Sequence, residues 1–354
     1  MSNKKDRFNQ IMDFRYALIY LALFLVVSAV ALYIIYNLFA EGFNFQRILD
    51  FPFEVLAMLG VLLFFYFLFD GLRLFAILKT LEAEITFFAI YKLVFINLFV
   101  SNITPLASGG GFAQVYFLQH KGVPLGKSSA ATLIRTLLAT TMLFIGAPLV
   151  LLSNERMLSL VPGNSVYYYL AAFVGLYLLF FYFIIFKNKL LKKLIYQLLS
   201  FLKSKNILSE KRYKKILRYL FDNLDMFIDD LILFVYGKKL YVILSFLFTV
   251  IFLLSEFSFS YLLLTGMGYD VSFSHVITLQ VVVVFLMYFA PTPGASGVAE
   301  GGYSLLFRQI VTKNDVFPLI FYWRFLTKYI GMFIGIFVFS RLILKGDSAD
   351  EEQG

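Results

Sequence analysis

Two six-residue stretches, TPLASG at residues 104–109 and TPGASG at residues 292–297, are identical at every position but one. Each stretch interrupts a hydrophobic segment with proline, glycine and small polar residues. Apolar segments that are broken at corresponding places in two halves of a chain indicate the binding site of a membrane transporter. The repeated stretch therefore predicts two broken helices that share one site.

The composition places the chain in a membrane. Hydrophobic residues make up 60% and charged residues 15% of the 354 residues, and several apolar runs reach the roughly 20 residues that a spanning helix needs. The sequence has no cysteine and only two histidines, which excludes thiol chemistry and argues against a histidine-built metal site. It also has no nucleotide-binding fingerprint. We expect an all-α polytopic membrane protein that is not an enzyme, has no cofactor and binds no nucleic acid.

The apolar segments divide into full spans and shorter broken pairs. Six segments are long enough to be full transmembrane helices: residues 16–39, 54–78, 128–152, 165–186, 240–264 and 316–344. The segments 86–121 and 273–310 break at the Thr-Pro stretches, and we interpret each as a re-entrant helical hairpin, because irregular backbone at membrane depth must be surrounded by protein or a wet cavity.

Residues 187–239 form a basic region between the two halves. They hold 13 Lys and Arg residues against 5 Asp and Glu residues, and their apolar residues recur at helical steps. This pattern predicts an amphipathic connector that lies on the anionic cytoplasmic leaflet. An alternative is a connector packed under the bundle. The positive-inside rule then places both termini in the cytoplasm and the chain in the cell membrane.

This topology makes the two halves an inverted repeat. The first hairpin enters from the cytoplasm and the second enters from outside. We expect a single membrane domain over residues 1–345, with repeat 1 at 54–152, repeat 2 at 240–344, and a disordered acidic tail at 346–354.

Charged residues occur at similar places in both repeats. Asp70 and Arg135 flank the first hairpin, and Glu256 and Arg324 flank the second. Charges inside spans are costly, so they usually face the bundle interior and have a function. Arginine binds phosphate in a bidentate manner and stays charged when it loses water, which favours an anionic headgroup as ligand. The open alternative is a structural ion pair, Arg135–Asp70 or Arg324–Glu256.

The hairpin tips and the last span supply further candidate residues for substrate binding. The tips offer small side chains and backbone N–H groups at the start of a returning helix, which attract anions. An acid just past the second tip could cap that helix, and a lysine lies in the last span. These candidates are Ser108, Gly109, Ser296, Gly297, Glu300 and Lys328.

One enzymatic motif overlaps the second tip. Residues 294–297 fit the G-x-S-G of rhomboid-type intramembrane proteases. That chemistry needs a histidine to activate the serine, and in that family the histidine follows the serine in the sequence. Here His275 precedes Ser296, and no histidine follows. An intramembrane serine hydrolase is therefore the least favoured alternative.

The two motifs together resemble the membrane region of lysylphosphatidylglycerol synthases and related stand-alone membrane proteins. The resemblance rests on Asn-x-Thr-Pro-x-x-Ser-Gly-Gly from residue 102 and on PTPGASGVAE at 291–300, and it covers about residues 10–345. It implies a flippase-like fold, with Glu300 and Arg324 at family positions. The sequence departs at Gly111 and Gln114, where many relatives carry a charge pair.

We therefore expect a translocator that moves a phospholipid or a polyprenyl-phosphate-linked lipid between leaflets. The second hypothesis is a non-transporting membrane protein that anchors or regulates a lipid-modifying enzyme. A homodimer is a further open alternative. Because the resemblance does not extend to the soluble aminoacyl-transferase domain of the synthases, we expect the chain not to make lysyl-lipid itself.

Overall fold

The computed structural model describes residues 51–152, 165–186, 188–205 and 209–351, together with the single positions 22, 26, 29, 30 and 33. All regular structure within these residues is helical. This confirms the prediction of an all-α fold. The predicted first span, the loop after it and residues 153–164 lie outside the described residues, apart from those five single helical positions.

Within the described part of the chain, the first half contains two long helices that flank a short helical pair. The long helices are α4 (Phe53–Thr80) and α7 (Leu125–Leu152). Between them, α5 (Phe87–Ile103) and α6 (Ser108–His120) are joined by the 3-10 turn η1 (Pro105–Ala107). The turn occurs where the first Thr-Pro stretch breaks the apolar run, because proline lacks the N–H that would continue the helix.

The second half repeats this order. The helix α12 (Lys239–Gly266) comes first, a short helical pair follows α12, and a long broken helix follows the pair. The pair and the broken helix comprise α13 (Phe273–Met287), η2 (Pro293–Ala295), α14 (Val298–Phe307), η3 (Lys313–Asp315), α15 (Val316–Arg324), the π-helix η4 (Phe325–Tyr329) and α16 (Ile330–Glu351).

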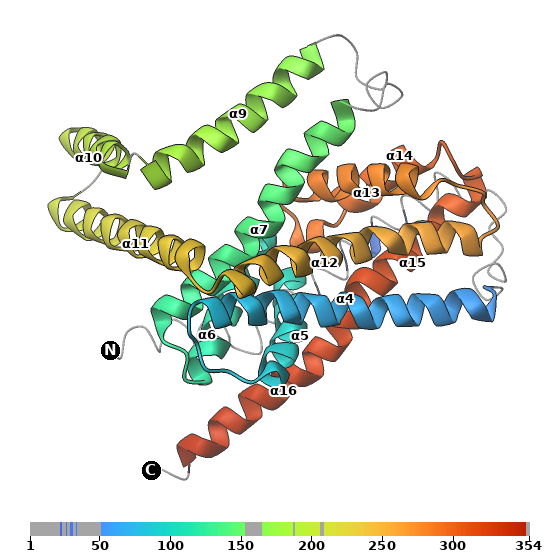
Figure 1. Cartoon of the computed structure of the whole chain (residues 1–354), viewed down its shortest axis with the longest axis horizontal. Helices are drawn as coiled ribbons and strands as arrows, with labels where there is room; N and C mark the ends of the chain where they lie inside the picture. Colours follow the sequence, from blue (N-terminus) through green and yellow to red (C-terminus); the bar gives the residue numbers. More distant parts are fainter. Residues whose placement is uncertain are drawn as a thin grey trace.

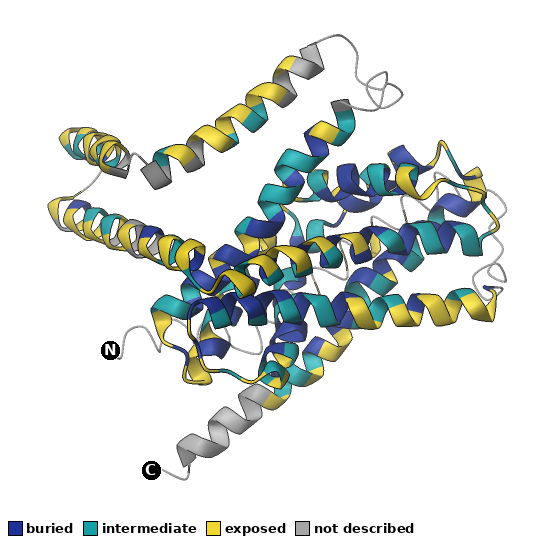
Figure 2. Cartoon of the chain, in the orientation of Figure 1, coloured by how far each residue is buried: buried dark blue, intermediate teal, exposed yellow. Residues whose placement is uncertain are grey.

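Among the residues that the structure describes, four helical segments are long and apolar enough to cross a membrane. They are Phe53–Thr80, Leu125–Leu151, Lys239–Gly266 and Lys313–Arg341, and they coincide with four of the six predicted spans. A fifth predicted span, residues 165–186, forms the helix α9 (Ser165–Phe186). The outer faces of α4 and α12 carry many exposed residues (Figure 2). These residues include large apolar side chains, as expected of helices that face lipid.

The two halves pack against each other in reciprocal pairs. α4 lies along α12 (Figure 1), while α5 packs on α16 and α13 packs on α7. In chain order, α5 corresponds to α13, and α7 corresponds to the helix that ends as α16. Each half therefore places its short helix against the long final helix of the other half. This exchange is the contact pattern that a pseudo-two-fold relation between the halves produces.

The connector forms two helices that project from the bundle (Figure 1). α10 (Asn188–Ser204) and α11 (Glu210–Tyr236) run side by side, held by the ion pairs Lys203–Glu210 and Lys192–Asp225. The hydrogen bond between Lys203 and Glu210 lowers the pKa of Glu210 and raises the pKa of Lys203. Both shifts favour the charged forms, so the pair stays ionised at neutral pH.

The C-terminal end differs from the prediction. The backbone of α16 continues as helix to Glu351, so residues 346–351 of the tail, predicted to be disordered, are helical. Extending an existing helix by one residue costs little compared with starting a new one, so the long final helix can propagate into polar sequence.

Candidate functional site

The two Thr-Pro tips, η1 and η2, contact each other. Each tip holds two consecutive residues in the left-handed conformation. In η1 these are Leu106 and Ala107, with φ of 54° and 52°, and in η2 they are Gly294 and Ala295, with φ of 59° and 57°. They occupy the same positions of the repeated motif. The repeated sequence therefore encodes a repeated turn.

The threonine of each motif closes its turn. Thr104 Oγ1 accepts a hydrogen bond from the N–H of Gly109 at 3.0 Å and donates one to the carbonyl of Val100 at 2.8 Å. Thr292 Oγ1 donates to the carbonyl of Ser296 at 2.7 Å. A Cβ on Gly109 would lie 2.5 Å from Thr104 Cγ2, so this position requires glycine.

A cavity of about 450 Å³ lies between the two halves of the chain. Both tips contribute to its wall, and so do helices of each half. Its charged lining residues include four of the candidates predicted from the sequence. The charged residues that line it are Asp70, Arg73, Arg135, Glu256 and Lys328.

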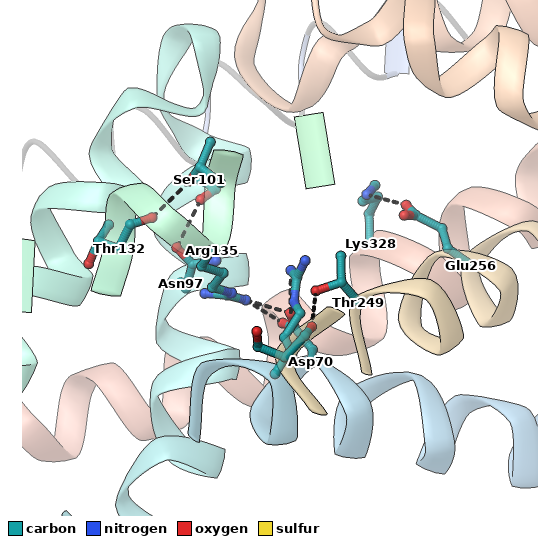
Figure 3. A network of polar contacts seen from close by, with 11 residues as sticks. Asp70, Asn97, Ser101, Thr132, Arg135, Thr249, Glu256 and Lys328 are labelled. Carbon is teal, nitrogen blue, oxygen red and sulfur yellow. Dashed lines mark hydrogen bonds and ion pairs between the residues drawn. The ribbon is translucent and has the colours of Figure 1, made fainter. Parts of the chain in front are cut away.

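Asp70 organises the first group of charges in this wall. Arg135 on α7 donates from Nη2 to both carboxylate oxygens of Asp70 at 2.6 Å, and Arg73 donates from Nε at 2.7 Å. The guanidinium of Arg73 also lies over the ring of Phe252, 3.9 Å from its centroid. Two arginines thus share one buried carboxylate, as Figure 3 shows for Asp70 and Arg135. The predicted Arg135–Asp70 pair is confirmed.

The second half contributes a single ion pair to the cavity. Lys328, in the π-helix η4, donates to Glu256 on α12 at 3.1 Å. Figure 3 shows this pair apart from the Asp70 group. Lys328, rather than Arg324, is therefore the partner of the acid in the second repeat.

Arg324 occupies a different environment from the one that the sequence predicts. It donates from Nε to Glu300 at 2.7 Å and from Nη2 to the carbonyl of Gly294 at 3.1 Å. Both Arg324 and Glu300 are 0% exposed, and neither lines the cavity. The predicted Arg324–Glu256 pair is wrong, because Arg324 is enclosed behind the second tip. Glu300 caps α14 as predicted, since its Oε2 accepts from the N–H of Gly297 at 2.6 Å.

The other four tip candidates lie at the starts of the returning helices. Ser108 and Gly109 begin α6, while Ser296 and Gly297 precede α14. The cavity wall at the tips consists instead of neighbouring residues, among them Ala107 and Ala295. The structure therefore gives these four residues a part in shaping the turns.

The serine of the protease-like motif is far from the candidate histidine. His275 lies in the first turn of α13, whereas Ser296 follows the other end of that helix. The helix between them is roughly 18 Å long at about 1.5 Å per residue. A Ser–His pair therefore does not form. Among the described residues, no group of three or more His, Asp or Glu side chains could hold a metal ion.

Sequence reasoning missed several polar residues of the cavity. Arg73 lies one turn beyond Asp70 on the same helix face, and this spacing was a usable signal. Thr132, Thr136 and Thr140 recur every four residues along α7, which marks one face of an apolar helix. The other neutral polar residues that were missed are Tyr66, Asn97, Ser101, Asn102, Gln114, Tyr288 and Thr292.

The fold and the cavity define a class: a multi-pass helical membrane protein with a charged cavity between two pairs of short helices, each pair joined by a tight turn. The chain belongs to the family described as the lysylphosphatidylglycerol synthase TM region, whose model matches residues 19–335. It is also similar to a UPF0104 membrane protein of Archaeoglobus fulgidus, with 25% identity over 270 residues, which is 76% of this chain and 81% of the relative. The family resemblance seen in the motifs is thus confirmed.

Proposed function

We propose that this protein moves a lipid with an anionic phosphate headgroup between the two leaflets of the cell membrane, as a flippase or scramblase rather than as an enzyme. The observation that carries the proposal is the charged cavity between the two halves. Charges within a membrane-spanning bundle are expensive and are retained where they serve a function. Membership of a membrane family connected with lipids supports the same conclusion.

The short helical pairs support a re-entrant topology. α5 has 17 residues and α13 has 15, which gives about 25 and 22 Å at 1.5 Å per residue. A hydrocarbon core is about 30 Å thick, so each pair would enter and return on one side. Together with six full spans and cytoplasmic termini, this arrangement makes the halves an inverted repeat, with the tips meeting near the centre of the membrane.

The shared carboxylate suggests how a phosphate would bind. Asp70 is held by both Arg73 and Arg135, so Arg135 can exchange it for a phosphate while Arg73 keeps the carboxylate paired. Arginine forms bidentate bonds with either group. An ion pair that opens in this way lets Arg135 stabilise the folded protein and also bind the headgroup during translocation.

The test of this function is lipid movement in liposomes. Purified protein is reconstituted with an acyl-labelled anionic phospholipid, and the loss of label from the inner leaflet is followed. Arg135→Gln should slow this movement by about ten-fold or more, because a hydrogen bond to a charged group is lost. Asp70 still has Arg73, so the fold should survive.

The matched control is Arg308→Gln, an exposed arginine at the end of α14. It removes the same charge from the protein without touching the cavity, and we expect unchanged movement. Equal rates for the wild type and Arg135→Gln would remove Arg135 from the mechanism. Absence of any movement above that of protein-free liposomes would count against translocation itself.

One observation favours the second function, an anchor or regulator of a lipid-modifying enzyme. α10 and α11 project from the bundle and carry many exposed residues (Figure 2). The exposed apolar side chains of α10 include Leu194, Leu198 and Phe201. The many lysines of α10 and α11 suit contact with an anionic leaflet. Slower hydrogen exchange of these two helices in anionic nanodiscs than in neutral nanodiscs would support this contact. A partner protein that copurifies in stoichiometric amount, with no lipid movement by the isolated chain, would favour the regulator.

A further inference from the structure

The cavity carries an unbalanced charge. Three cationic side chains face two carboxylates among its described lining residues, Arg73, Arg135 and Lys328 against Asp70 and Glu256. One positive charge therefore remains. A ligand that carries a single negative charge would neutralise it, and the balance matters because charges away from water must be compensated.

Spare hydrogen-bond donors gather on the wall from the first half. Arg73 on α4, Gln114 on α6 and Arg135 on α7 are 6%, 2% and 5% exposed. Within the described part of the chain, Arg73 Nη1, Gln114 Nε2 and Arg135 Nε lack a hydrogen-bond partner. Buried donors without partners are rare and costly. Three of them belong to residues of one wall, so a ligand that supplies acceptors, such as phosphate oxygens, suits this side of the cavity.

The neighbouring face of α7 has the opposite character. Thr132, Thr136 and Thr140 each donate their hydroxyl proton to the carbonyl four residues earlier, at 2.8, 3.1 and 2.9 Å. A hydroxyl that donates in this way still offers lone pairs as acceptors. This face therefore suits ligand groups that donate hydrogen bonds without adding positive charge, which describes alcohol hydroxyls.

Resting on the proposed function, we infer that the cavity selects a phosphodiester of single negative charge whose headgroup carries hydroxyl groups. A phosphomonoester carries about −1.5 to −2 at pH 7 and would leave excess negative charge. A zwitterionic headgroup with an ammonium group would leave the positive charge uncompensated. Two sources share the selected chemistry: a glycerophospholipid with a polyol headgroup, and a polyprenyl phosphate joined to a sugar.

The test compares three acyl-labelled lipids in the reconstituted system: phosphatidylglycerol, phosphatidic acid and phosphatidylethanolamine. We expect phosphatidylglycerol to move about ten-fold faster than either of the other two lipids, because one or two additional hydrogen bonds correspond to about this factor. Equal or faster movement of the other two overturns the inference but leaves translocation standing. An unlabelled polyprenyl phosphoryl hexose that competes better than unlabelled phosphatidylglycerol identifies the polyprenyl lipid as the source, and weaker competition identifies the phospholipid.

A binding readout separates the two claims if no lipid moves. The rise in Tm of the purified protein is then measured with each of the three lipids. A larger rise with phosphatidylglycerol supports the selectivity although translocation fails, and equal rises overturn the selectivity as well.

Two variants test the chemistry within the cavity. Thr136→Val removes the acceptor with little change in shape and should narrow the preference for phosphatidylglycerol over phosphatidylethanolamine. The matched control is Thr278→Val on α13, which is half-buried, lies outside the cavity wall and donates in the same way to the carbonyl of Ser274. Equal effects of the two valine variants would overturn the acceptor role.

The second variant, Glu256→Gln, raises the cavity charge by one. It should shift the preference toward phosphatidic acid, the more highly charged lipid. A gained preference cannot result from misfolding, so this variant remains informative even if the protein loses stability. An unchanged order of the three lipids would overturn the charge argument.

Discussion

At the residue scale, the charges within the helical bundle divide into two kinds. Arg135 and Lys328 line the cavity, whereas Arg324 and Glu300 are enclosed by protein. An ion pair that is enclosed by protein cannot reach a ligand. The attraction between its two charges offsets the free-energy cost of removing them from water. We therefore interpret Arg324 as the residue that fixes the second tip, because it also binds the carbonyl of Gly294.

The structural role of Arg324 gives a stability prediction. Arg324→Met leaves Glu300 charged and unpaired in the interior, and the free energy of unfolding should fall by about 3–5 kcal/mol. The double variant E300Q/R324M removes both charges and should recover much of the loss. Thermal unfolding in detergent, followed by the fluorescence of Trp323, measures both. A fall no larger than that of the exposed Arg308→Met would contradict this role.

At the scale of the helices, the tight contact between α16 and α5 depends on glycine. Gly331 and Gly335 lie four residues apart, the spacing that lets membrane helices approach closely. A Cβ on Gly335 would lie 2.3 Å from the carbonyl oxygen of Phe95 and 2.7 Å from Phe99 Cβ. The backbone of α5 therefore occupies the space that a side chain would need.

Gly335→Ala should destabilise the protein by about 1–3 kcal/mol, the usual cost of overpacking. The control is Gly301→Ala in α14, where no atom lies within 4 Å of the added Cβ and alanine favours the helix. We expect the Tm of the control to stay the same or rise. Equal Tm values for the two variants would mean that α16 can move away from α5 at little cost.

The helices show where sequence reasoning succeeds and where it stops. Proline and glycine break an apolar run wherever it occurs, so both turns could be predicted from the repeated stretch. Arg324 and Lys328 are one helical turn apart and point in similar directions, so spacing could not decide which one meets Glu256. That choice depends on how α15 and η4 pack, and a π-helix has no signature in the sequence.

The cavity shows the same limit. The charged candidates Asp70, Arg135, Glu256 and Lys328 could be found because a charge in an apolar segment is conspicuous. Threonine and asparagine are common in helices that line no binding site. The asparagines of α5 and the threonines of α7 can therefore be recognised as site residues only when the structure shows that they line the same cavity.

At the scale of the whole molecule, the proposed inverted repeat makes a prediction about sidedness. The chain has no cysteine, so single reporters can be introduced without background. Lys121 follows the first helical pair, Lys205 follows α10 and Asp270 precedes the second pair, and all three are exposed. If both pairs are re-entrant, Lys121 and Lys205 face the cytoplasm and Asp270 faces outward.

The measurement is labelling of intact cells with a membrane-impermeant thiol reagent. Asp270→Cys should react at once, while Lys121→Cys and Lys205→Cys should react only after the membrane is opened. If α5 crossed completely and α6 did not return, Lys121 would lie outside, and so would the connector with its excess of lysine and arginine. The positive-inside rule disfavours that arrangement, and labelling of Lys121→Cys in intact cells would establish it and end the inverted-repeat interpretation.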